Sequence, residues 1–173
     1  MSVISRRIAV LSGFMALSGL GGAVALADEA AEFAALAKAL PSAKVTLQQG
    51  LTASESTGRP ISAKFELEDG HRQLSVYTAK GSGFQEVVIN HTTGAVAKTE
   101  AISEPDDLKA ANAQSEVMGR AKSSLKAAVD AAEKALPGFR AVSVTPSLKD
   151  KHAVAAVTLR KGSDVKSVTE SLE

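Results

Sequence analysis

Residues 62–96 read SAKFELEDGHRQLSVYTAKGSGFQEVVINHTTGAV, and this stretch decides the fold. Apolar residues at Ala63, Phe65 and Leu67 alternate with charged ones, which predicts a half-buried strand with one apolar and one charged face. Turn chemistry follows at 68–71, where glycine accepts a positive φ and aspartate bonds to its local backbone, and the alternation then resumes. The stretch therefore opens with a predicted β-hairpin.

Two later turns extend this hairpin into a sheet. Gly81-Ser82-Gly83 leads into a predicted third strand from Phe84 to Ile89. We interpret these glycines as a hairpin turn and not as a phosphate-binding loop, because neither a strand-to-helix junction nor a Lys-Ser/Thr pair follows them. The segment Asn90–Gly94 then turns the chain towards a short segment at Ala95–Ala97.

Two helices are predicted before this stretch. The first spans Asp28–Leu40, whose apolar residues form one stripe, and it ends at Pro41. In the second helix, Thr46 is the expected N-cap, and Gln49 is the residue that completes a capping box. This helix is expected to run to about Thr57, where Gly-Arg-Pro ends it.

The second half of the chain begins at an acidic segment that contains proline. Glu104-Pro105-Asp106-Asp107 suits the first turn of a helix. The apolar spacing predicts that this helix continues to Leu136 and that Pro137-Gly138 ends it, and whether Gly119 kinks it or splits it in two is left open. Three strands separated by turns follow at Val142–Pro146, Ala153–Leu159 and Val165–Thr169.

The order of helix and three strands is therefore expected twice. The matching segments are Lys80-Gly81-Ser82 with Lys161-Gly162-Ser163, and Leu47–Leu51 with Leu125–Val129. We predict an N-terminal unit at 28–103 and a second unit at 104–173, which is shorter because it lacks a counterpart of Thr92-Thr93-Gly94. Each repeat alone has a size at which a core is marginal, so we expect the two to pack together.

Composition excludes several classes of function. The chain has 173 residues, of which 45% are hydrophobic, and this is enough for a core. Aromatic residues make up only 3%, and 20 Lys and Arg are balanced by 19 Asp and Glu, so we expect neither base-stacking platforms nor a basic footprint for nucleic acid. The absence of cysteine from the sequence excludes disulfides and thiol chemistry.

Residues 1–27 have the pattern of a signal peptide. Two arginines precede an apolar run from Ile8 to Leu26, which ends in the small-x-small sequence Ala25-Leu26-Ala27. We predict cleavage before Asp28 and a periplasmic or secreted protein that is soluble and free of the membrane; the alternative is an uncleaved membrane anchor. Ser5-Arg6-Arg7-Ile8 partly resembles a twin-arginine signal, but alanine replaces its usual phenylalanine, so the export route stays open.

The segment Val88–Val96 closes the first unit with the order Val-x-Asn-x-x-Thr-Gly-x-Val. It resembles the closing segment of the PepSY domain, where Asp stands at the place of Asn90. In that domain a helix of the type aliphatic-x-x-Ala-x-x-x-Ala precedes a strand hairpin. The second unit matches through the helix at Ser124–Val129 and its strands. The resemblance covers residues 43–173 and implies an α+β fold of tandem PepSY (cystatin-like) repeats, each a helix packed on an antiparallel β-sheet.

This resemblance implies a binding function. PepSY domains occur in propeptides of thermolysin-type metallopeptidases, where they help to restrain the peptidase, and some relatives bind metal ions. The chain has no His-Glu-x-x-His motif and no Gly-x-Ser-x-Gly elbow, so we expect neither catalysis nor a cofactor. We predict an exported non-catalytic module that modulates an envelope peptidase or another periplasmic protein; the alternative is a periplasmic metal-ion or small-ligand binding protein. The oligomeric state is left open.

Candidate metal ligands gather at two turns and one helix start. The turn candidates are Glu68, Asp69 and His71, with Asp150 and His152 as their counterparts in the second half. Their simpler interpretation is as solvated turn residues. Glu104, Asp106 and Asp107 are also candidate Ca²⁺ ligands, although helix N-capping explains these acids more simply.

Candidate partner-binding residues lie in the closing turn. Asn90, His91, Thr92 and Thr93 would form a presented loop of the kind that inhibitor modules use. The structural alternative is that Asn90 bonds to the following amides while Gly94 lets the chain fold back. An exposed edge strand is a further candidate surface, because its unpaired backbone groups can capture an extended peptide.

Overall fold

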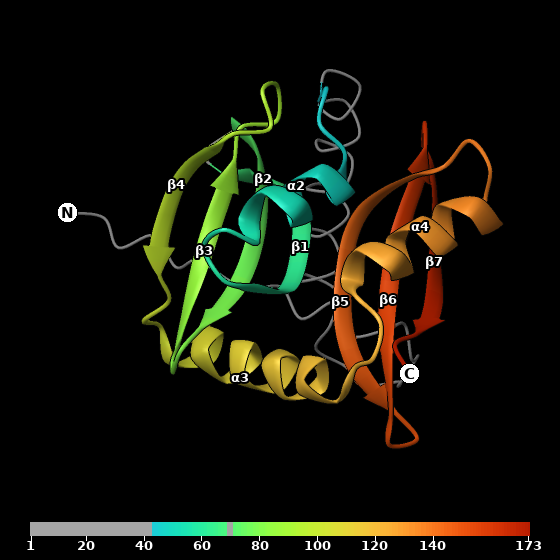
Figure 1. Cartoon of the computed structure of the whole chain (residues 1–173). Coiled ribbons are helices and arrows are strands. Elements are labelled where there is room, and N and C mark those ends of the chain that lie inside the picture. Colours follow the sequence, from blue (N-terminus) through green and yellow to red (C-terminus); the bar gives the residue numbers. More distant parts are fainter. Residues whose placement is uncertain (1–42, 69–70) are drawn as a thin grey trace, which may run out of the picture.

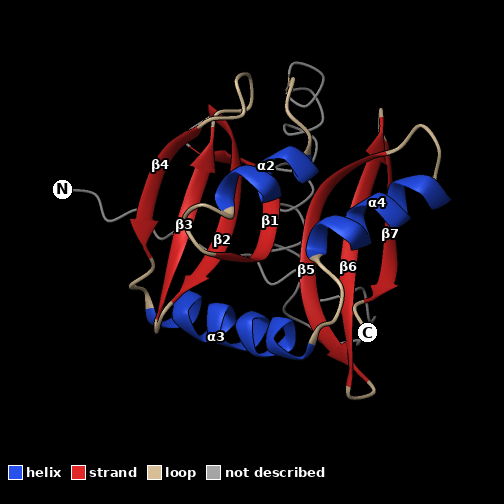
Figure 2. Cartoon of the chain, in the orientation of Figure 1, coloured by secondary structure: helices blue, strands red, loops and turns tan. Residues whose placement is uncertain are grey.

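The computed structural model describes residues 43–68 and 71–173, so the predicted signal peptide and the predicted helix at 28–40 lie outside the described residues. These residues form three helices and seven strands, whose arrangement is shown in Figures 1 and 2. In chain order these are α2 (Leu47–Ser54), β1 (Arg59–Glu68), β2 (His71–Lys80), β3 (Gly83–Ile89), β4 (Val96–Ala101), α3 (Pro105–Arg120), α4 (Leu125–Ala135), β5 (Arg140–Lys149), β6 (His152–Lys161) and β7 (Asp164–Ser171).

All seven strands form one antiparallel sheet in the order β4-β3-β2-β1-β5-β6-β7. The predicted α+β class is therefore confirmed. Helices α2 and α4 lie beside each other over the sheet, and α3 runs across one end of it (Figure 1). No helix in the described part of the chain is long and apolar enough to cross a membrane.

The local signals at the start of α2 are confirmed. The Thr46 side chain accepts a hydrogen bond from the Gln49 backbone, and the Gln49 side chain accepts one from the Thr46 backbone, which completes the capping box. The hairpin strands are also confirmed, although β1 begins at Arg59 and not at Ser62. Its pairing with β2 extends that far because a bulge between Pro60 and Ser62 absorbs one residue.

The structure corrects one expectation about the middle of the chain and answers one open question there. The segment after the closing turn was expected at Ala95–Ala97, but β4 runs from Val96 to Ala101 because it pairs with β3. The long helix does not break at Gly119. Helix α3 continues to Arg120, and α4 begins after Ser124, whose side chain accepts a hydrogen bond from the Ala127 amide.

The two halves have matching geometry. Strand β2 begins at His71 and β6 begins at His152, so equivalent residues of the two halves are 81 positions apart. The same offset relates the bulge of β1 to a bulge of β5 between Ala141 and Ser143. The halves join where Ala63 of β1 pairs with Val144 of β5, and these two residues are themselves related by the same offset. A residue that pairs with its own counterpart marks an approximate two-fold axis through the centre of the sheet.

The core lies between the helices and one face of the sheet. Fully buried residues include Leu47 and Leu51 of α2, Leu74 of β2 and Val129 of α4. Helix α2 approaches the sheet closely, since a Cβ atom added to Gly50 would lie 2.4 Å from Leu74 Cδ2. The core is built almost entirely from aliphatic side chains, as the low aromatic content predicts.

Side chains also tie the halves together. Gln48 of α2 donates hydrogen bonds to Asp130 and Glu133 of α4, at 3.2 and 2.8 Å. Arg140 of β5 donates to the carbonyls of Ala43, at 2.9 Å, and Val45. Burial lowers the pKa of Arg140, and the nearby Glu133 carboxylate opposes this shift.

Candidate functional site

The predicted metal ligands do not form a cluster in the described part of the chain. His71 is exposed at the start of β2, while Asp69 and the side chain of Glu68 lie outside the described residues. Among residues 43–68 and 71–173, no three His, Cys, Asp or Glu side chains are placed to hold a metal ion. The metal site at the first turn stays a prediction.

The corresponding turn of the second half has a different partner. His152 Nδ1 lies 2.9 Å from Glu173 Oε2, while Asp150 is exposed in the turn at a φ of 51°. The hydrogen bond from His152 lowers the pKa of the Glu173 carboxyl below its ordinary value. His152 therefore contacts the last residue of the sequence, a pairing that local spacing does not indicate.

The acidic residues at 104–107 lie at the start of α3. Glu104 is the N-cap residue but its side chain makes no capping hydrogen bond, so the expected N-capping by an acidic side chain is not observed there. Asp106 and Asp107 lie in the first turn, where the positive end of the helix dipole favours a carboxylate. Asp107 is largely buried.

The Asn90–Gly94 turn is bonded within itself. Asn90 Oδ1 accepts hydrogen bonds from the amides of Thr92 and Thr93, at 2.9 and 3.0 Å. The Gly94 amide donates to the Asn90 carbonyl at 2.8 Å, and Gly94 has a φ of +77°. The Thr92 and Thr93 side chains are exposed, and the turn geometry is the one that the structural interpretation requires.

His91 has a further role that the sequence analysis missed. Its carbonyl accepts hydrogen bonds from the amides of Lys44 and Val45, at 2.9 and 3.1 Å, and so holds the chain that enters α2. In the second half the Leu172 carbonyl accepts equivalent bonds from Lys122 and Ser123, which lead into α4. The second half thus retains this anchor beyond its last strand.

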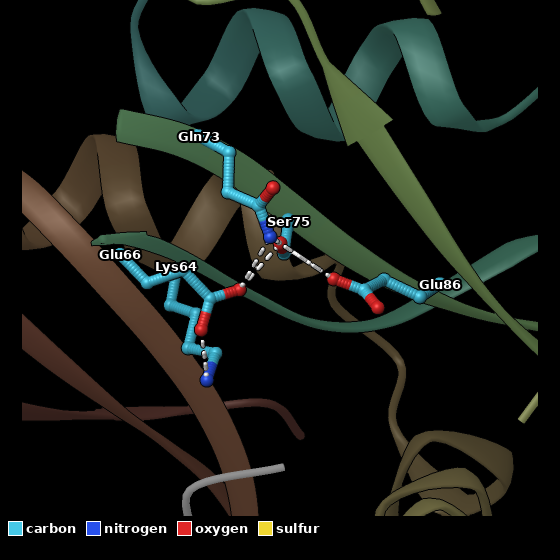
Figure 3. Close-up of polar contacts among 5 residues, drawn as sticks. All are labelled: Lys64, Glu66, Gln73, Ser75 and Glu86. Atoms are coloured by element: carbon cyan, nitrogen blue, oxygen red, sulfur yellow. Dashed lines mark hydrogen bonds and ion pairs between the residues drawn. The ribbon is translucent and has the colours of Figure 1, made fainter. Parts of the chain in front are cut away.

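A polar cluster lies on the sheet face opposite α2. Ser75 follows the core residue Leu74, so its side chain points to the other face. Ser75 Oγ lies 2.5 Å from Glu66 Oε1 and 2.8 Å from Glu86 Oε1, and the Gln73 amide donates to the same three oxygens (Figure 3). The Lys64 ammonium is 2.5 Å from the other oxygen of Glu66.

This arrangement does not suit nucleophilic catalysis. Ser75 is fully buried, and the Lys64 ammonium pairs with the carboxylate of Glu66. The serine hydroxyl has one proton, and two carboxylate oxygens lie within hydrogen-bond distance of it. The cluster therefore links β1, β2 and β3 through buried polar contacts.

A pocket of about 680 Å³ lies between the end of α2, the start of β1 and the α3–α4 junction. Arg59, Lys122 and Lys126 contribute positive charge to it, and Glu55 contributes a negative charge. Met118 and Leu125 form part of its apolar wall.

The outer edge of β7 presents unpaired backbone groups. The Leu172 amide donates a hydrogen bond to the Ala153 carbonyl, and this bond continues the β6–β7 ladder. In this ladder the even-numbered residues from 164 to 170 form the hydrogen bonds to β6. The alternate residues Val165, Ser167 and Thr169 therefore point their N–H and C=O groups away from β6. No strand in the described part of the chain pairs with them.

The equivalent edge in the first half is covered. The offset of 81 residues relates Val165, Ser167 and Thr169 of β7 to Phe84, Glu86 and Val88 of β3. The Phe84 carbonyl accepts a hydrogen bond from the Ile102 amide. The register of β3 with β4 continues this ladder, so Glu86 and Val88 also direct their N–H and C=O groups to β4. The first half thus shows that one antiparallel strand fits this edge.

Comparison with known proteins does not assign the chain: no family, no curated protein and no solved structure matches it.

Proposed function

We propose that the protein is an exported, non-catalytic binding module made of two PepSY-like repeats, and that it modulates an envelope peptidase. The observation that carries the proposal is the open edge of β7, where Val165, Ser167 and Thr169 offer the backbone groups that their counterparts in β3 use to bind β4. An extended segment of the partner would add to this edge as an eighth strand.

The side chains of β7 define the segment that fits. Lys166, Val168 and Glu170 share one face of the strand, because residues two apart point to the same side. An antiparallel segment gains cross-strand pairs when it places a basic residue opposite Glu170, an apolar residue opposite Val168 and an acidic residue opposite Lys166. Read from its N-terminus, the fitting segment has the pattern basic-x-apolar-x-acidic.

The peptidase class of the partner rests on the resemblance to PepSY domains, and the export rests on the predicted signal peptide. Strand addition suits the restraint of a peptidase, because such enzymes bind substrates as extended chains. The captured segment would then be one that the peptidase needs for activity.

A proline variant of the edge tests the proposal. Ser167→Pro removes an outward N–H without removing a hydrogen bond to β6, since proline is tolerated on edge strands at such positions. Thr99→Pro is the matched control, because Thr99 is exposed and its amide points outward from β4 at the opposite edge. Circular dichroism should show that both variants keep the wild-type fold.

The measurement is capture from a periplasmic extract, followed by assay of the captured peptidase. We expect the wild-type protein and the Thr99→Pro variant to capture a peptidase and change its activity, and the Ser167→Pro variant to need at least about tenfold more protein for the same effect. Absence of any captured peptidase, or equal capture by all three proteins, would contradict the proposal.

A further inference from the structure

We infer that the open edge of β7 also accepts β7 of a second copy of this chain, in an antiparallel two-fold arrangement centred on Val168, so that self-association occupies the binding edge. The dimer follows from the edge itself; only its competition with a partner rests on the proposed function. The inference starts from the sequence of β7, in which Lys166-Ser167-Val168-Thr169-Glu170 has the basic-x-apolar-x-acidic pattern that fits this same edge.

Charge selects the register. In the arrangement centred on Val168, each Lys166 lies opposite Glu170 of the second copy, and the two Val168 side chains meet. A centre at Ser167 instead places Asp164 opposite Glu170, two like charges, and a centre at Thr169 places Val168 opposite Glu170. Charged residues on an edge usually prevent pairing, but here the alternating signs favour one register over its neighbours.

The backbone is in phase with this register. Ser167 of one copy lies opposite Thr169 of the other, and both have outward N–H and C=O groups that can exchange hydrogen bonds. Val168 then forms a pair without hydrogen bonds, at which Cα atoms lie about 4.5 Å apart. The isologous contact closes on itself and therefore gives a dimer with no filament.

The helices leave room for this contact. Helix α4 packs across β5, β6 and β7, so its axis lies close to β6 (Figure 1). In a continuous sheet the β6 strands of the two copies would be three strand spacings apart, roughly 14 Å. Packed helices need only about 8–10 Å between their axes, so the two α4 helices would not collide.

Charge reversal with complementation tests the dimer in the full chain. In the dimer, Lys166→Glu places four acidic residues at the contact, and Glu170→Lys places four basic ones. Because like charges then face each other, each variant alone should dimerise on the order of tenfold more weakly than the wild type, as measured by sedimentation velocity. An equimolar mixture should recover the wild-type affinity, because every lysine again faces a glutamate. Recovery in the mixture also shows that both variants are folded, although Lys166→Glu removes a contact of Lys166 with the Phe139 ring.

A cysteine variant tests the register. The chain contains no cysteine, so Val168→Cys introduces a single thiol at the centre of the contact, within the Cα separation that a disulfide spans. We expect rapid oxidation to a covalent dimer that no longer captures the peptidase, and slow oxidation of the control Val96→Cys on the exposed edge β4. Equal oxidation of both variants would overturn the register.

The two proposals fail in different ways. A wild-type protein that stays monomeric at its highest soluble concentration, or a mixture that does not recover, would overturn the dimer even if peptidase capture through β7 is observed. A protein that shows complementation but captures no peptidase, even at concentrations at which sedimentation shows it to be monomeric, would support the self-association and overturn the proposed function.

Discussion

At the scale of single residues, one contact shows how the two halves solve the same packing problem differently. Gly50 of α2 lies against Leu74 of β2 in the first half. Their counterparts in the second half are Ala128 of α4 and Ala155 of β6, both buried. A larger helix residue is thus matched by a smaller strand residue, because the space between helix and sheet has to be filled without overlap.

This exchange predicts the outcome of a double-mutant cycle. Gly50→Ala should destabilise the protein by about 1–3 kcal/mol, because the added Cβ would lie 2.4 Å from Leu74 Cδ2. Leu74→Ala should cost about 2–5 kcal/mol through loss of burial and the cavity left behind. The double variant should cost clearly less than the sum of the two, as measured by urea unfolding. Additive costs would show that the two residues do not share this space.

The contact between His152 and Glu173 predicts a local pH effect. The hydrogen bond from His152 lowers the pKa of Glu173 in the folded protein. The bond therefore stabilises the folded protein above the unfolded-state pKa of glutamate, and this stabilisation is lost as pH falls through the lowered folded-state pKa. His152→Ala should raise the pKa of Glu173 towards its ordinary value, measured by NMR titration of the carboxyl carbon. His71→Ala is the control and should leave the Glu173 titration unchanged.

At the scale of elements, the junction of α3 and α4 shows that the end of a helix depends on the contacts of the next segment of the chain. Gly119 lies within α3, is exposed, and has open space around the position of a Cβ. The chain leaves the helix only after Arg120, where Lys122 and Ser123 donate their amides to Leu172 and Ser124 caps the next helix. The break is therefore set by these tertiary hydrogen bonds and the cap, and not by the glycine.

Replacement of this glycine tests that explanation. Gly119→Ala should stabilise the protein by about 0.5–1 kcal/mol, because alanine loses less backbone entropy in a helix and meets no neighbouring atom here. The control Gly94→Ala should instead be destabilising by about 1–2 kcal/mol, since Gly94 has a φ of +77°. Loss of stability in Gly119→Ala, measured by thermal and urea unfolding, would show that the glycine is required at the junction.

At the scale of the whole molecule, a short pairing of β1 with β5 makes one sheet from two halves. Ala63 and Val144 meet at the approximate two-fold axis, and Val144 is fully buried. The contacts of Gln48 and Arg140 cross the same boundary. We therefore expect the halves to unfold together, in keeping with the small size of each half.

A core substitution at this joint tests the coupling. Val144→Ala should lower the free energy of unfolding by about 2 kcal/mol. Native-state hydrogen exchange should show that the amides of β2 and of β6 lose the same free energy of protection. The control Val165→Ala, at an exposed position of β7, should change stability by less than about 0.5 kcal/mol. Loss of protection confined to β5, β6 and β7 would mean that the halves unfold separately.

The sequence by itself determined the local elements of this protein. The alternation around Phe65 predicts β1, the capping pair Thr46 and Gln49 predicts the start of α2, and the matching Lys-Gly-Ser turns predict the repeated order of elements. These features depend on residues only a few positions apart, whose backbone preferences and hydrogen bonds act within one turn or one strand.

Only the tertiary structure decided how these elements meet. The pairing of Ala63 with Val144, the meeting of Glu66 and Glu86 at Ser75, and the length of β4 all join residues whose proximity no local pattern encodes. The open edge was anticipated as a type of surface, but its outward residues Ser167 and Thr169 became known only from the hydrogen-bond phase of the ladder with β6. Strand alternation specifies which residues share a face; pairing between strands, which depends on the packing of the whole core, specifies which backbone groups remain free.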